Sequence, residues 1–203
     1  MHSLDVNIRQ QRAESEGLMQ LIDNMISLDP RYQKTVAELV MIRLFSMLEE
    51  HFQSITLKVL CGALYLDNTA PTITVRCRSM RVASTQIANY GRSTPLQAYK
   101  IKWNQAVEIR NNVRYMLPAT ENLITVFDRH ATLIDDMRRV RNHIAHNNVD
   151  TARKYKLVVQ RHYGAFASSI TPSVLLISNR RNPILIKQYL IASRIIIKEL
   201  VRG

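Results

Sequence analysis

Residues 120–148 of the chain read TENLITVFDRHATLIDDMRRVRNHIAHNN. Apolar residues recur at intervals of three and four positions through this stretch, as they do on the buried face of an amphipathic helix. They are Leu123, Ile124, Phe127, Leu133, Ile134, Met137, Val140 and Ile144. We therefore expect one helix that Thr120 caps and that leads into the polar run 138–148, with three arginines, two histidines and three asparagines.

Similar periodic segments occur elsewhere in the chain. They predict helices over residues 4–27, 33–66, 97–116, 152–163 and 184–201. Asn182 and Pro183 suit the N-cap and first position of the last helix. The pattern predicts an all-α protein.

Residues 67–96 interrupt the helical pattern with the turn signals Asp67-Asn68 and Ala70-Pro71. Residues 72–78 then alternate with period two, which is typical of a short strand, and the apolar run 173–178 is a candidate partner strand. We expect a small hairpin or loop insertion around 67–96, rich in arginine, that can contact a substrate.

The chain has 203 residues and a net charge of +12, and 46% of its residues are hydrophobic. This composition predicts one packed domain over 1–203, in which 1–30 form an acidic N-terminal helix and 67–96 the basic insertion. Residues 1–50 hold five Lys or Arg and eight acidic residues, whereas 51–203 hold twenty-three and eight. The positive charge therefore lies in the same part of the chain as the Arg/His cluster, and it favours a polyanionic partner such as nucleic acid.

Cysteine content and apolar run lengths bear on the compartment. Cys61 and Cys77 form no metal-ligand pattern, and no secretory signal opens the sequence, so we expect reduced thiols in a cytoplasm. No apolar run reaches the length of a membrane span, and no membrane partner is expected.

The cluster 138–148 suits cleavage of RNA without a metal. Attack by the ribose 2′-OH needs a base, an acid for the leaving 5′ oxygen, and positive charge on the phosphate. Histidine can serve in either proton-transfer role, and arginine donates two hydrogen bonds to a phosphate at once. Only RNA carries the 2′-OH, so we expect RNA as the substrate and neither a cofactor nor a metal ion.

Two adjacent carboxylates precede the cluster. Asp135 and Asp136 point apart if they lie on a helix, and Asp135 stands three and four residues before Arg138 and Arg139. We expect ion pairs here in preference to a metal site.

Helical geometry separates the members of the cluster. Arg138, Asn142 and His146 are four apart and line one stripe, whereas Arg141 lies about 140° around an ideal helix from His146. The two can reach one phosphate if the helix ends near Ala145 or the arginine wraps back, and the asparagines that follow favour an early end. One such site supplies one histidine, so a symmetric dimer would bring the second proton-transfer group.

The sequence Arg141-Asn142-His143-Ile144-Ala145-His146 resembles the signature of the HEPN superfamily, which is an arginine, a polar residue such as asparagine, a spacer and a histidine. Four residues separate Arg141 from His146. Two other registers fit the same pattern: Arg139 with His146, and Arg138 with His143. Of the three registers, the residues of Arg141 with His146 are the most similar to the family pattern.

The resemblance implies an antiparallel helical bundle that dimerises and acts as a metal-independent ribonuclease, in toxin–antitoxin or anti-phage systems. In that reading Arg141 holds the phosphate, His146 transfers protons and Asn142 supports both. Arg138 and Arg139, with Arg76 and Arg78 of the insertion, would bind RNA, and an antitoxin or another defence protein is a possible partner. The same residues leave two alternatives open: a non-catalytic nucleic-acid-binding protein, and a helical interaction module for a partner protein.

Overall fold

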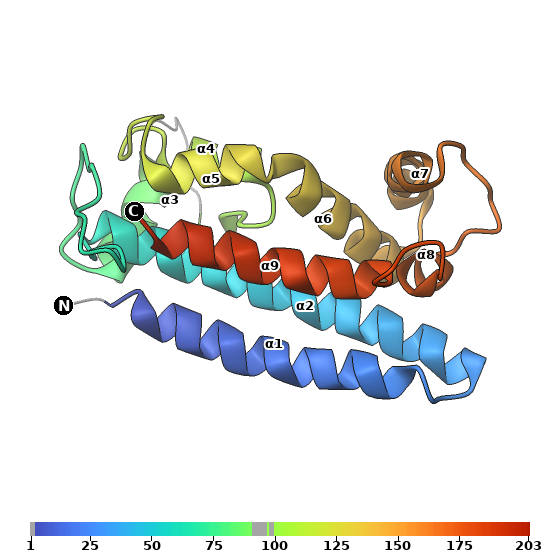
Figure 1. Cartoon of the computed structure of the whole chain (residues 1–203). Helices are drawn as coiled ribbons and strands as arrows, with labels where there is room; N and C mark the ends of the chain where they lie inside the picture. The colour runs from blue at the N-terminus through green and yellow to red at the C-terminus, as the bar shows by residue number, and fades with distance from the viewer. Residues whose placement is uncertain (1–2, 91–96, 98–99) are drawn as a thin grey trace. The chain divides into compact units, whose positions relative to one another are not determined.

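The computed structural model describes residues 3–90, 97 and 100–203, and these residues confirm the predicted all-α class (Figure 1). The helices of this part of the chain are α1 (Asp5–Met25), α2 (Pro30–Leu60), α3 (Met80–Asn89), α4 (Ala106–Val113), α5 (Asn122–Arg129), α6 (Ala131–His146), α7 (Val149–Tyr163), α8 (Pro172–Ile177) and α9 (Leu185–Val201). The chain divides into two compact units, so the prediction of one domain stays a prediction.

The first unit comprises residues 1–11, 48–134 and 195–203. Its core holds the rings of Phe52 and Phe127, which meet edge to face with centroids 5.0 Å apart. Both rings are almost fully buried, so this pair removes a large apolar area from water. The buried Glu121 carboxylate accepts hydrogen bonds from the Tyr65 hydroxyl and the Thr72 backbone N–H, which ties the loop after α2 to the start of α5.

The second unit comprises residues 12–47 and 135–194, and it contains the whole Arg/His cluster. Its buried apolar side chains come from α1, α2, α6, α7, α8 and α9, and they include Ile22, Met41, Leu44, Phe45, Met137, Val140, Val158, Leu176, Ile186 and Leu190. Polar contacts add to this packing: Arg194 Nε donates to Ser15 Oγ over 2.8 Å, and Lys187 pairs with Asp23 over 2.8 Å. Helix α6 is thus held along its apolar stripe, and its other side carries the polar residues.

The predicted strand at 72–78 is wrong, although the alternation behind it is real. Exposed and less exposed side chains do alternate from Pro71 to Arg78. The backbone partners are not a strand, however: Thr74 N–H donates to Met116 O, and Cys77 N–H donates to Leu60 O. The segment is therefore an extended loop that packs one side of its chain inward, and period two alone did not distinguish it from a strand.

The candidate partner strand at 173–178 is also wrong, because this segment is helix α8. Thr171 caps it by accepting a hydrogen bond from Val174 N–H, and Pro172 takes the first turn, where a missing N–H costs nothing. Thr171 and Pro172 signal the start of a helix, and this signal outweighs the strand preference of the apolar run 173–178.

The expected insertion at 67–96 is partly helical. Helix α3 begins after the cap Ser79 and buries Ala83, Ile87 and Ala88, small or isolated apolar residues that give a weak periodic signal. Residues 91–96 of this prediction lie outside the described residues. The predicted helix at 97–116 is shorter than expected, because Ile101 and Trp103 are buried in non-helical chain before α4 begins.

The helix expected from Thr120 through Ile144 is two helices. The first starts at Asn122 after Glu121, and it ends at His130, which has φ −99° and ψ 7°. The His130 ring and the Arg129 guanidinium both contact the Glu199 carboxylate, at 3.0 Å and 2.8 Å, and these contacts fix the break. The last helix starts at Leu185, so Pro183 is not its first residue.

Candidate functional site

Helix α6 ends where the sequence places its asparagines. It is helical through His146, and Asn147 then adopts a left-handed backbone with φ +38° while its N–H donates to His143 O. Asn148 caps α7: its side chain accepts from Thr151 N–H, and the Thr151 hydroxyl accepts from Asn148 N–H. This corner leaves His146 exposed at the end of the helix.

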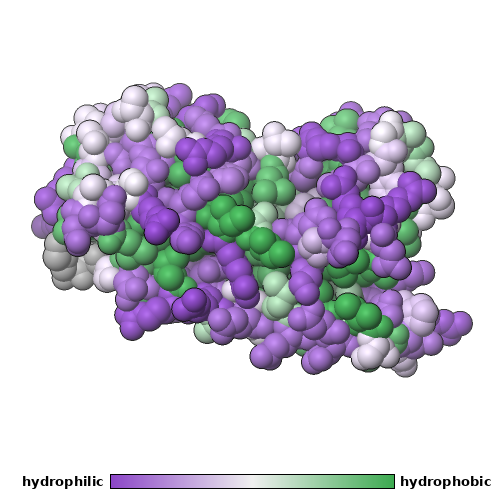
Figure 2. Space-filling model, viewed as in Figure 1, coloured by the Kyte–Doolittle hydropathy of each residue, from purple (hydrophilic) through white to green (hydrophobic). Residues whose placement is uncertain are grey.

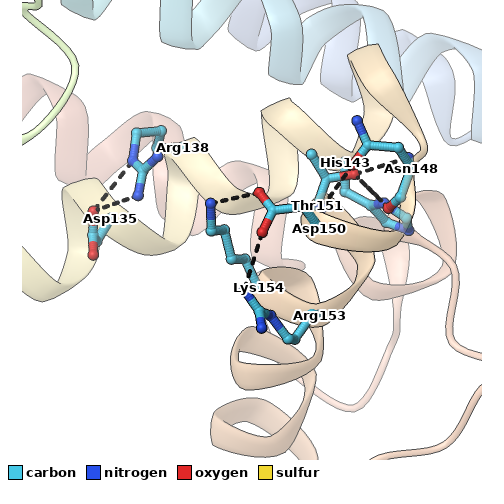
Figure 3. Close-up of polar contacts among 8 residues, drawn as sticks. All are labelled: Asp135, Arg138, His143, Asn148, Asp150, Thr151, Arg153 and Lys154. Carbon is cyan, nitrogen blue, oxygen red and sulfur yellow. Dashed lines mark hydrogen bonds and ion pairs between the residues drawn. The ribbon is translucent and has the colours of Figure 1, made fainter.

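The first turn of the cluster is paired with acid, as the sequence predicts. Asp135 Oδ1 accepts from Arg138 over 3.2 Å, and Asp135 Oδ2 accepts from Arg139 over 3.0 Å (Figure 3 draws the Arg138 pair). The exposed fractions of the side chains are 34% for Asp135, 14% for Arg138 and 19% for Arg139, so water screens these pairs only in part. The Asp135 carboxylate therefore offsets part of the charge of both guanidiniums within α6.

Asp136 is buried and takes part in a second group of pairs. It lies 3.8 Å from Arg139 and pairs closely with Arg161 of α7. Sequence reasoning missed Arg161, because it stands 25 positions after Asp136 in the chain and no local spacing links the two.

Arg141 has a different environment. Its Nη1 donates to Asn142 Oδ1 over 3.0 Å, and its buried Nε has no hydrogen-bond partner in the part of the chain that the structure describes. Among the same residues, no carboxylate pairs with it, so its charge is not balanced locally. The Asn142 oxygen is turned toward Arg141, and the amide N–H groups of Asn142 therefore face away from that guanidinium.

The two histidines of the cluster differ as well. His143 is half-buried and stacks on Tyr155 of α7, with ring centroids 4.8 Å apart. Its Nδ1 lies 3.3 Å from the Thr151 hydroxyl, and Figure 3 shows these two side chains next to each other. Burial lowers the pKa of His143, although the charge of Glu38 acts in the opposite direction. His146 is exposed and free to meet a ligand.

The remaining predicted RNA-binding residues lie in the first unit. Arg76 is exposed, and its guanidinium lies against Gly62, which has φ +79°. Arg78 is exposed at the rim of a hollow of about 490 Å³ with Ser79, Arg81, Val82, Thr85 and Gln86. Arg138, Arg139, Arg141, Asn142 and His146 all lie on α6, whereas Arg76 and Arg78 belong to a different compact unit.

A cavity of about 460 Å³ opens beside the end of α6, entirely within the second unit. His143, Ile144 and Asn147 form one wall, and Glu38 and Phe166 contribute from α2 and from the loop after α7. No local spacing pointed to Glu38 or Phe166, because neither residue stands near the cluster in the chain.

Within residues 3–90, 97 and 100–203, no group of three or more His, Cys, Asp or Glu is placed to hold a metal ion. In the same residues, no helix combines the length and apolar character needed to cross a membrane. The chain matches no protein-family model, no curated protein and no solved structure.

Proposed function

We propose that this protein is a metal-independent endoribonuclease of HEPN type that uses Arg141 and His146. The observation that carries the proposal is the contrast along α6: Asp135 pairs with Arg138 and Arg139, whereas Arg141 has an amide partner and no carboxylate among the described residues. His146 follows Arg141 by five residues, and α6 is helical through His146, so the two residues lie about 140° apart around the helix. The long Arg141 side chain must therefore wrap back for both residues to meet one phosphodiester.

Each residue then has a distinct role. Arg141 binds the scissile phosphate and stabilises the charge that grows on it. Asn142 holds the Arg141 guanidinium through its side-chain oxygen and offers its amide N–H groups to the same phosphate. His146 takes the proton of the 2′-OH or gives a proton to the 5′ oxygen. His143 is less suited to proton transfer with solvent, because it stacks on Tyr155 and burial lowers its pKa.

The proposal includes a homodimer, since acid and base together need two groups. Apolar side chains reach the surface among hydrophilic ones (Figure 2). In the second unit they include Leu21, Ile26, Leu28, Tyr32, Leu39, Val149, Leu157 and Ile191. Val149, directly after the cluster, is 88% exposed. A second copy that docked beside Val149 would add its own His146.

The biological setting is part of the proposal as the family resemblance implies it. The chain would act in the cytoplasm as a toxin or anti-phage effector, and an antitoxin or another defence protein would restrain it. The net charge of +12 supports attraction to RNA in that setting.

The test is cleavage of total RNA and tRNA by the purified chain in the presence of a chelator. The wild type should cleave, and His146→Ala and Arg141→Ala should not, with all three folded by circular dichroism. Equal cleavage by all three would refute the proposal. RNA binding that weakens steeply with salt, without cleavage by the wild type, would assign the chain to the non-catalytic alternative.

A further inference from the structure

The cavity at the end of α6 has the composition of a site for a flat polar ring. Its volume of about 460 Å³ is within the range of small-molecule sites. Tyr155 and Phe166 supply aromatic wall, while Glu38, Asn147 and Ser168 supply polar groups. The cavity shares His143, Ile144 and Asn147 with the proposed catalytic segment, so a ligand in it would lie next to any RNA bound there.

The cavity walls are held in place from several sides. The Tyr155 hydroxyl donates to Ile170 O over 3.1 Å, and the Tyr155 ring stacks on His143. Phe166 keeps 41% of its surface exposed, and the Lys156 ammonium lies 5.1 Å from the centre of its ring. An exposed ring beside a cation is a place where a nucleobase can stack and its phosphate can find positive charge.

Glu38 is the charged group of the cavity lining. It lies on α2, half-buried, and the structure gives it no hydrogen bond or ion pair with any described residue. Its charge acts on His143 and Tyr155, which also line the cavity. A carboxylate that lines a cavity and has no cation partner offers two acceptor oxygens. A ligand with two hydrogen-bond donors can satisfy both of them.

We propose that this cavity binds a guanine base of the RNA substrate, with Glu38 accepting from the base and Phe166 stacking on it. The proposal rests on the proposed ribonuclease function for its substrate and adds a sequence preference to it.

The pattern of donors on each base selects guanine. Guanine presents N1–H and N2–H side by side, and both can donate to the two oxygens of one carboxylate. Adenine and cytosine pair one amino donor with a ring nitrogen acceptor, and uracil places its N3–H between two carbonyl oxygens. Each of these three bases would put an acceptor against a carboxylate oxygen, and a site that pairs well with one base rejects the others.

The test has two readouts on the full chain. The first is the affinity for guanosine 5′-monophosphate and adenosine 5′-monophosphate, measured by calorimetry on the His146→Ala protein. The second is the sequence at the ends that the His146 protein makes from a randomised oligoribonucleotide library. Both are repeated with Glu38→Gln, because glutamine offers one acceptor and one donor and so matches adenine. Glu16→Gln is the matched control: it removes the same charge from the exposed surface of α1 in the same unit.

The expected result is at least about tenfold tighter binding of the guanine nucleotide, and a guanine at a fixed position beside the cut. Glu38→Gln should abolish or reverse this preference toward adenine, and Glu16→Gln should keep it. Equal affinity for the two nucleotides, or an unchanged preference in Glu38→Gln, would overturn the assignment.

The two proposals can fail separately. Cleavage that depends on His146 but shows no guanine preference would remove the pocket assignment and leave the ribonuclease. Guanine binding that depends on Glu38, in a chain that cleaves no RNA, would remove the ribonuclease and leave a guanine-nucleotide site.

Discussion

Two successive turns of α6, residues 135–139 and 141–146, hold arginine in opposite electrostatic conditions. In the first, Arg138 and Arg139 share the Asp135 carboxylate and are mostly covered. In the second, Arg141 contacts a neutral amide, and His146 is exposed. A count of arginines makes these turns look equivalent, but the partners decide which guanidinium keeps its charge for a ligand. The comparison teaches that the acidic neighbours of a basic motif carry information about its site.

The largest expected effect belongs to the exposed histidine. His146→Ala should lower the rate of RNA cleavage by about 10²–10⁴-fold, the usual contribution of general acid–base catalysis. Single-turnover cleavage of a labelled oligoribonucleotide measures it. The control is the thermal midpoint of His146→Ala, which should match that of the wild type because the His146 side chain is exposed. A lowered midpoint together with the loss of cleavage would point to damage to the fold and count against a role in the chemistry.

The next effect separates the two turns. Arg141→Ala should lower cleavage by about 10²–10³-fold, since it removes the charge on the phosphate. Arg139→Ala should lower it less than tenfold, because Asp135 already offsets part of the charge of that guanidinium. Arg141→Lys should recover only part of the activity, as an ammonium cannot donate the same forked pair. If Arg139→Ala lowered cleavage more than Arg141→Ala, the result would favour the register of Arg139 with His146.

A smaller effect tests whether Asp135 limits the binding of RNA by Arg138 and Arg139. Asp135→Asn should tighten RNA binding and steepen its salt dependence by up to about two phosphate contacts, because Arg138 and Arg139 lose the carboxylate that they share. Filter binding at several salt concentrations gives the slope. Asp5→Asn, which releases Arg9 in the first unit, is matched in charge and should change the slope less. Equal slopes for the two variants would mean that the salt dependence follows the net charge of the protein and not the release of Arg138 and Arg139.

The smallest effect concerns His143, the half-buried histidine of the second turn. Burial lowers the pKa of His143, so the unfolded chain binds more protons than the folded one below a pH of about 6.5. Stability should therefore fall as the pH drops from about 7 to about 5. His162, whose pKa burial also lowers, contributes in the same direction. Urea midpoints at both pH values should differ less in His143→Gln than in the wild type, and an equal difference would count against the argument.

Local spacing predicted much of this molecule. It gave the all-α class, the ion pairs of Asp135 with Arg138 and Arg139, and the left-handed asparagine that follows α6. These features depend on neighbours within one turn of helix. The failures depend on more distant partners: Glu199 stabilises the break at His130, and Met116 and Leu60 take the backbone bonds of the expected strand.

The candidate site follows the same division. The cluster itself was visible as a run of residue types, but the difference between Arg139 and Arg141 needed their contacts. Glu38 lies on a helix about a hundred residues before the cluster, and only the packing of the second unit puts it beside His143. Sequence spacing therefore located the motif and could not describe the cavity next to it.

The most direct measurement is cleavage, in chelator, of an oligonucleotide that has ribose only at the cut position, beside the same strand with 2′-deoxyribose there. We predict that the wild type cuts the first and leaves a 2′,3′-cyclic phosphate, that it leaves the second intact, and that Arg141→Ala and His146→Ala cut neither. Cleavage of the deoxy strand, or undiminished cleavage by either variant, would contradict the account.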